Sequence, residues 1–226
     1  LLNTGSKIIY SKNRLLTTIA YRIKGKTTYA MEGSIFIAGA GVQWLRDKLN
    51  FFKNASETEN IVKSLKDNKG VYLVPAFTGL GAPYWDANAR GVLSGLTRDT
   101  GPKEIIRATI ESVAYQTYDL FEAMKHDGLR PKLVKVDGGM VMNNWFSQFL
   151  SDVVDIKVLR PRVQETTALG AAFMAGLQIG VYKSLKDISK NWQLDKDFTP
   201  KINAKNRKTL VKGWSAAIKK TLTKAI

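Results

Sequence analysis

Short β-branched segments alternate with helical segments along this chain, and that order restricts its possible folds more than any other feature. Strand patterns flank Lys24-Gly25-Lys26, a hairpin signal, and recur later; they cover residues 15–23, 27–31, 71–74, 92–96, 133–136 and 156–159. Helical spacing of apolar residues predicts helices over residues 35–49, 102–124, 143–153, 165–176 and 206–224. Ser56 and Glu59 form a capping-box pattern that predicts one further helix. Such alternation predicts an α/β fold in which helices cover the faces of a sheet.

Composition excludes several kinds of site. The 226 residues are 44% hydrophobic, which suffices for one large domain or two small ones. The chain has no cysteine and one histidine, His126, so disulfides and thiolate metal sites are excluded and Ser-His-Asp chemistry is disfavoured. Because no apolar run reaches transmembrane length and no signal-peptide pattern opens the chain, we expect a cytoplasmic protein. The chain opens at Leu1 with a mid-strand pattern instead of Met, so we expect a piece of a longer protein.

The formal net charge of +16 raises the alternative of a nucleic-acid partner. Much of the excess lies in residues 183–226, which contain 11 Lys and 1 Arg against 3 Asp. Neither an Arg-rich helix nor an RNA-binding aromatic pattern accompanies these lysines, so we interpret most of them as a solvated surface. A basic nucleic-acid-binding module stays the alternative, and it predicts an affinity that falls steeply with added salt.

The most informative local motif is a predicted strand that ends at Asp137-Gly138-Gly139, followed by a helix that starts near Asn143. A glycine pair at a strand-to-helix turn allows a ligand to lie against bare backbone, and the helix N-terminus offers N–H groups and a positive dipole end. The same pattern also suits an ordinary tight turn. Asn143 fits both readings, because an N-cap residue can also face a ligand. For Asp137 we favour a structural role in the turn over a metal–phosphate contact.

A second place with bare backbone is the start of the helix predicted over residues 35–49, Ala38-Gly39-Ala40-Gly41. Glycine at these positions lowers helix propensity, so we expect the small residues to be there because another group approaches the backbone closely. Gln43 lies one turn beyond Gly39 on the same face, where it serves either as a partner for an adenine edge or ribose or as a surface residue. The two bare segments are candidates for the two walls of one crevice. Small residues also dominate residues 165–176, which predicts a tightly packed helix. No paired catalytic carboxylates are evident; the candidates by charge alone are Asp86, Glu111 and Glu165.

Several motifs in the same order give the chain a family resemblance. They are Glu32–Asp47, Val74–Asp86 with its Gly-Ala-Pro-Tyr-Trp-Asp loop, Gly91–Leu96 with Ala108–Glu111, Asp137–Asn143, and Glu165–Gly176. Together they resemble the C-terminal domain of the FGGY carbohydrate kinases, in the branch that phosphorylates glycerol. The resemblance implies a ribonuclease H-like domain of the actin/hexokinase ATPase type, with a mixed sheet and flanking helices. We expect this nucleotide-binding domain to span residues 1–182, with residues 183–226 as a basic helical tail packed on it.

The resemblance also implies an activity and a site. The activity is phosphorylation of glycerol by ATP to glycerol 3-phosphate, with Mg²⁺ held mainly through the nucleotide and an N-terminal domain. The implied ATP/ADP contacts are Gly39, Gln43, Gly139 and Asn143, with no metal ligand and no catalytic residue in this chain. In the family the glycerol-binding groups, the catalytic aspartate and a Gly-Thr-Gly phosphate turn precede this region, so we expect the chain alone to be inactive.

The implied partners are small molecules, with no nucleic acid and no membrane span, and the parent enzyme is expected to be a homo-oligomer. Two further alternatives stay open. One is another FGGY sugar kinase, of the xylulose or gluconate type, and the other is a stand-alone interaction domain left by gene splitting.

Overall fold

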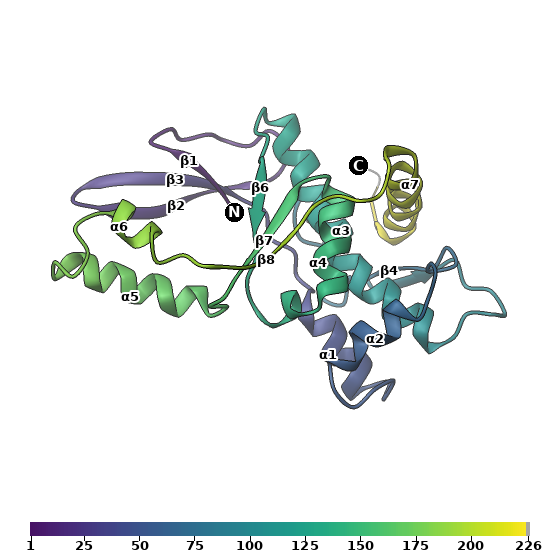
Figure 1. Cartoon of the computed structure of the whole chain (residues 1–226). Helices are drawn as coiled ribbons and strands as arrows, with labels where there is room; N and C mark the ends of the chain where they lie inside the picture. The colour runs from purple at the N-terminus through teal and green to yellow at the C-terminus, as the bar shows by residue number, and fades with distance from the viewer. Residues whose placement is uncertain (225–226) are drawn as a thin grey trace.

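A three-stranded antiparallel sheet begins the chain in the computed structural model, which describes residues 1–224 (Figure 1). It consists of β1 (Leu2–Gly5), β2 (Leu16–Ile23) and β3 (Lys26–Glu32), in the order β1-β3-β2. The hairpin expected at Lys24-Gly25-Lys26 joins β2 to β3. Lys24 and Gly25 have φ angles of 48° and 76°, as a two-residue turn with two left-handed positions requires.

Two smaller sheets follow. β4 (Tyr72–Val74) and β5 (Val92–Ser94) pair antiparallel, whereas β6 (Leu133–Lys135), β7 (Lys157–Pro161) and β8 (Leu194–Phe198) form a mixed sheet in the order β6-β7-β8. β6 runs parallel to β7, and β8 runs antiparallel to it. The α/β class with a mixed sheet is therefore confirmed. The sequence analysis missed β8, because three charged residues and one buried apolar side chain, Phe198, give it no regular alternation.

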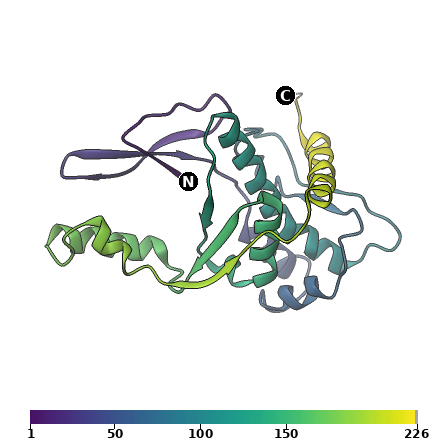
Figure 2. The ribbon, with the colours of Figure 1, turned by 45° about the horizontal axis from the view of Figure 1, so that its top comes forward.

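Seven α-helices are described among residues 1–224, and α3 lies at their centre (Figures 1 and 2). They are α1 (Gly39–Asp47), α2 (Glu57–Lys63), α3 (Pro102–His126), α4 (Asn144–Val154), α5 (Thr166–Gln178), α6 (Leu185–Ser189) and α7 (Ala204–Thr221). A 3₁₀ turn, η1 (Gly139–Met142), precedes α4. α3 packs against α1, α2, α4 and β4, and most of its residues from Glu104 to Gln116 are buried. This helix is the support on which the site elements are placed.

Aromatic side chains join α3, α4 and α7 in the main core. Tyr115 of α3 stacks on Trp214 of α7 with 5.3 Å between ring centroids, and Phe149 of α4 meets Tyr115 edge-to-face at 5.5 Å. Trp214 is fully buried, so α7 is part of the folded body. The predicted terminal helix is thus present, and its apolar face is the one that packs inward.

The predicted helix over residues 35–49 is wrong at its start, because α1 begins only at Gly39. The preceding carbonyl groups are used elsewhere: the Ser34 oxygen accepts from the Ala82 amide at 2.9 Å, and the Ile37 oxygen accepts from the Gln116 side chain at 3.2 Å. Residues 33–38 are therefore bonded to the loop and α3 and do not join the helix. Within α1, a side chain at Gly41 would lie 3.0 Å from Thr109 of α3, which explains one of the small residues.

The helix predicted to open at Ser56 is present as α2, with Ser56 as its N-cap residue, but the capping box is not formed. Ser56 makes no capping hydrogen bond; the amide of Asn54 instead donates to the Glu57 carboxylate at 2.7 Å, so this capping interaction lies two residues earlier. The packing expected for residues 165–176 is wrong. α5 is not tightly packed: it projects from the body in Figures 1 and 2, and Gly176 is its one buried residue. Small side chains permit close packing, but they do not create a partner.

Candidate nucleotide site

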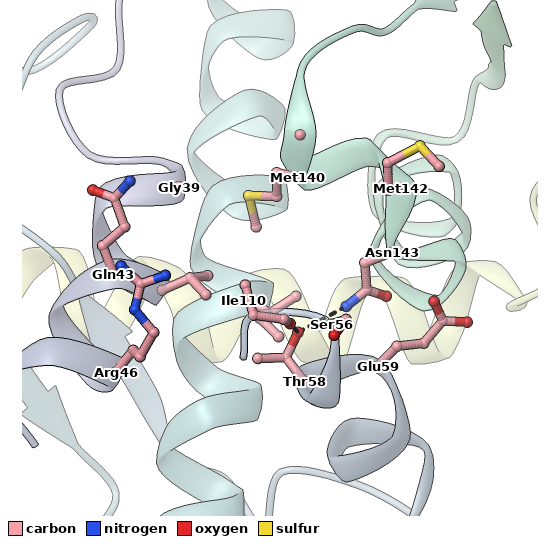
Figure 3. A pocket seen from close by; sticks show the side chains of 13 residues that line it. Gly39, Gln43, Arg46, Ser56, Thr58, Glu59, Ile110, Met140, Met142 and Asn143 are labelled. Carbon is pink, nitrogen blue, oxygen red and sulfur yellow. Dashed lines mark hydrogen bonds between the residues drawn. The ribbon is translucent and has the colours of Figure 1, made fainter. Parts of the chain in front are cut away.

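The four site residues expected from the sequence line one cavity of about 480 Å³. The cavity lies between α1, the segment that leads into α2, and the η1 turn before α4, with Ile110 of α3 at its base (Figure 3). Gly39 and Gln43 come from α1, and Gly139 and Asn143 come from the η1 turn and its end. The structure thus brings together residues that lie about a hundred positions apart in the chain.

The wall formed by residues 138–143 follows directly from the glycine pair. Gly138 has a φ angle of 84°, a left-handed conformation that favours glycine, and it starts the turn into η1. Gly139 has a bare surface: a Cβ atom built there would meet no atom within 4 Å. Asn143 is the N-cap of α4, as expected, because its Oδ1 accepts from the Phe146 amide at 3.0 Å. This wall therefore exposes backbone at one end and a fixed amide side chain at the other.

The opposite wall is the exposed face of α1. A Cβ atom at Gly39 would also meet nothing within 4 Å, so this glycine leaves open space in the cavity. Gln43 and Arg46 follow at one and two turns on the same face, and both line the cavity (Figure 3). No side chain caps the N-terminus of α1 and its first turn holds no acidic residue, so the positive end of its dipole is not neutralised.

The floor comes from the start of α2, which the sequence analysis did not assign to the site. Ala55, Ser56, Thr58 and Glu59 line the cavity. The Asn143 side chain donates to the Thr58 hydroxyl at 3.4 Å, shown as the dashed line in Figure 3. Met140, Met142 and Arg46 also line the cavity and were missed. Arg46 had a usable signal, its seven-residue spacing from Gly39, but nothing in the sequence relates α2 to Asn143.

Three of the other carboxylates considered in the sequence analysis, Glu111, Asp86 and Asp137, make structural hydrogen bonds. Glu111 is fully buried, and it accepts from Arg107 at 2.7 Å and from Asn68 at 2.6 Å. Asp86 accepts hydrogen bonds from Thr223 near the C-terminus. Asp137 accepts a hydrogen bond from Thr166, which agrees with the structural role favoured for it. Glu165 precedes α5 and makes no capping bond.

Among residues 1–224, no group of three or more His, Asp or Glu side chains is arranged to hold a metal ion. Within the same residues, no helix combines the length and the apolar character that crossing a bilayer requires.

Comparison with known proteins identifies the family of the chain. The model of the FGGY family of carbohydrate kinases, C-terminal domain, matches residues 4–179. The chain belongs to the FGGY family. The matched region includes α1, α2 and the η1 turn, and therefore every residue that lines the cavity.

Individual FGGY proteins give the same result in sequence and in structure. The chain is 54% identical to the glycerol kinase of Gluconobacter oxydans over 224 residues, and 54% identical to glycerol kinase 1 of Pseudomonas aeruginosa over 223. A crystal structure of Plasmodium falciparum glycerol kinase with ADP superposes on 99% of the chain with a TM-score of 0.89 and 37% identity. Xylulose kinase of Lactobacillus acidophilus matches with a TM-score of 0.79 at 23% identity, a likeness in fold.

These FGGY relatives are much longer than the chain. Each match includes 99% of this chain, but only 44% of the Gluconobacter protein, 45% of the Pseudomonas protein and 45% of the Plasmodium chain.

Proposed function

We propose that this chain is the nucleotide-binding half of a kinase that transfers a phosphoryl group from ATP to glycerol. The observation that carries the proposal is the convergence of Gly39, Gln43, Gly139 and Asn143 on one cavity. The similarity to glycerol kinases, at 54% identity, supports glycerol over xylulose or gluconate as the acceptor. The nucleic-acid alternative rests on net charge alone.

The cavity suits ATP or ADP by its shape and by its charges. The open space above Gly39 and Gly139 allows a flat or extended ligand to lie against the backbone. The uncapped N-terminus of α1 favours the phosphate end of the ligand. The wall opposite carries the Asn143 amide, which suits the nucleoside end. Mg²⁺ bound to the nucleotide would neutralise phosphate charge, and we expect it to be held mainly outside this chain.

We also propose that these 226 residues do not phosphorylate glycerol by themselves. Phosphoryl transfer requires that donor, acceptor and metal be positioned together. The cavity residues account for the donor, and the relatives are more than twice as long as the chain. A cytoplasmic location and a homo-oligomeric parent enzyme stay predictions.

The test is a chimeric kinase, in which this chain replaces the matching 44% of the Gluconobacter oxydans glycerol kinase. We expect the chimera to produce ADP only when glycerol is present, and the chain alone to produce none. A chimera with Gly139→Val is the matched control, and it should be inactive because the valine fills the ligand space. The proposal would be contradicted by a folded but inactive chimera, or by glycerol phosphorylation by the isolated chain.

A further inference from the structure

Glu59 lies where two elements of the candidate nucleotide site meet. It belongs to the first turn of the short helix α2, and its carboxylate reaches the first residue of α4. Its Oε2 accepts from the backbone amide of Asn144 at 3.1 Å, and its Oε1 accepts from the Asn144 side chain at 3.2 Å. One acidic side chain therefore binds the start of a different helix at two points.

The carboxylate is ionised in this position. Burial by itself raises the pKa of Glu59, but hydrogen bonds from Lys63 and Asn144 outweigh it, so the pKa lies below its ordinary value. The side chain is 19% exposed, and Lys63 pairs with it from one turn further along α2. A charged acceptor makes a stronger hydrogen bond than a neutral one, and a negative charge at a helix N-terminus is favourable. The hydrogen bonds that connect α2 to α4 are therefore strengthened by the charge of Glu59, although its side chain is partly exposed.

Arg160 of β7 holds the same turn from its other side. Its guanidinium donates to the Val141 oxygen at 2.8 Å, to the Met142 oxygen at 3.3 Å and to Asn144 Oδ1 at 3.2 Å. Its side chain is 7% exposed and pairs with Asp195 of β8 at 2.7 Å. Residues 141–144 therefore lie between an anion that binds N–H groups and a cation that binds oxygens.

These contacts fix the turn close to Gly139 and Asn143. Gly138 and Gly139 have no side chains, and a Cβ atom built at either would meet nothing within 4 Å, so the two glycines add no packing of their own, whereas Val141 further along the turn is buried in the core. The Asn143 side chain is tied to the same helix α2 through Thr58. We propose that Glu59 is a positioning residue for the nucleotide: through Asn144 it sets the distance between the α2 floor and the wall formed by Gly139 and Asn143. This inference rests on the proposed function, and the motifs that predicted the nucleotide contacts do not include Glu59.

The first measurement is the ADP dissociation constant of the 226-residue chain, determined by calorimetric titration. We expect Glu59→Ala to weaken ADP binding about tenfold, the effect of losing a charge-assisted hydrogen bond that positions ligand contacts. Glu59→Gln retains a carbonyl oxygen for the Asn144 amide, so it should recover most of the affinity. Glu57→Ala is the matched control: it removes the carboxylate that caps α2 at Asn54 but not the link to α4, and it should leave the affinity unchanged.

A double-mutant cycle separates positioning from direct contact with the ligand. If Glu59 acts by placing Asn143, then Glu59→Ala should weaken ADP binding much less in an Asn143→Ala background than in the unchanged chain. Equal, additive losses in the two backgrounds would contradict the positioning role. So would unaltered ADP binding by Glu59→Ala.

Hydrogen exchange without ligand gives an independent readout. Glu59→Ala should speed amide exchange in residues 139–144, whereas Glu57→Ala should not. Unchanged exchange in that segment would overturn the positioning role and leave the proposed function intact. Failure of the unchanged chain to bind ADP at millimolar concentration would instead contradict the nucleotide site, and with it the role given to Glu59.

Discussion

Asp119 is a buried carboxyl group that joins three separate segments. Its Oδ2 accepts from the Tyr84 hydroxyl at 2.8 Å and from the Trp214 indole N–H at 2.7 Å, so it connects α3 to the Gly-Ala-Pro-Tyr-Trp-Asp loop and to α7. Burial raises the pKa of Asp119 to about 7, although both hydrogen bonds act in the opposite direction. A carboxyl with this pKa changes charge within the physiological pH range.

This raised pKa predicts a pH-dependent stability. Because the folded-state pKa lies above the ordinary value of 3.8, the stability that Asp119 contributes is fully present below about pH 4 and is lost as the pH rises through 7. The Asp119→Asn side chain is neutral at every pH and of similar shape, so the stability of this variant should not fall with pH in this way. We expect the free energy of unfolding in urea to fall by about 2–3 kcal/mol more in the unchanged chain than in the variant between pH 5 and pH 8. Identical pH slopes for the two proteins would rule this out.

Residues of the site differ in how far the sequence could predict them. Gly39, Gln43, Gly139 and Asn143 lie in local patterns with a physical meaning, bare backbone beside a helix start, and the structure brings them to one cavity. Thr58 and Glu59 belong to a polar helix start that resembles many others. Their place in the site depends on how α2 packs against α4, and no local pattern contains that information.

At the scale of elements, the sequence predicts the helices that have a clear apolar face, but it predicts their boundaries less accurately. α3 and α7 show regular apolar spacing, and both contribute to the core. The start of α1 depends on Ala82 and Gln116, which take its potential helical acceptors from a distance. The exposure of α5 is likewise a tertiary property, since its sequence alone suits a tightly packed helix.

The attachment of α7 predicts a large effect from one core residue. Trp214→Ala should destabilise the chain by about 3–5 kcal/mol, because it leaves a cavity beside Tyr115 and removes the indole donor to Asp119. Lys212→Ala, on the exposed side of the same helix, is the control and should change stability by less than about 0.5 kcal/mol. Thermal or urea unfolding measures both. A small effect of Trp214→Ala would mean that α7 is not part of the cooperative core.

At the scale of the whole molecule, the chain spans less than half the length of the FGGY relatives that it matches. The FGGY match covers residues 4–179, and β8 and α7 then complete the mixed sheet and the core. The fold class was predictable because strands and helices alternate, and the family was predictable from its motifs. The division of the α/β body into three small sheets was not, since strand pairing depends on contacts between distant segments.

The central claim is that the cavity between α1 and η1 binds a nucleotide, and calorimetric titration of ADP into the 226-residue chain tests it most directly. We predict weak binding to the unchanged chain and at least a tenfold loss, roughly 1.4 kcal/mol, with Gly139→Val. The valine meets no protein atom near its Cβ, so the unfolding temperature should stay the same. Gly170→Val, at an equally open position on α5, should bind ADP normally. Equal ADP affinity for Gly139→Val and the unchanged chain would contradict the account.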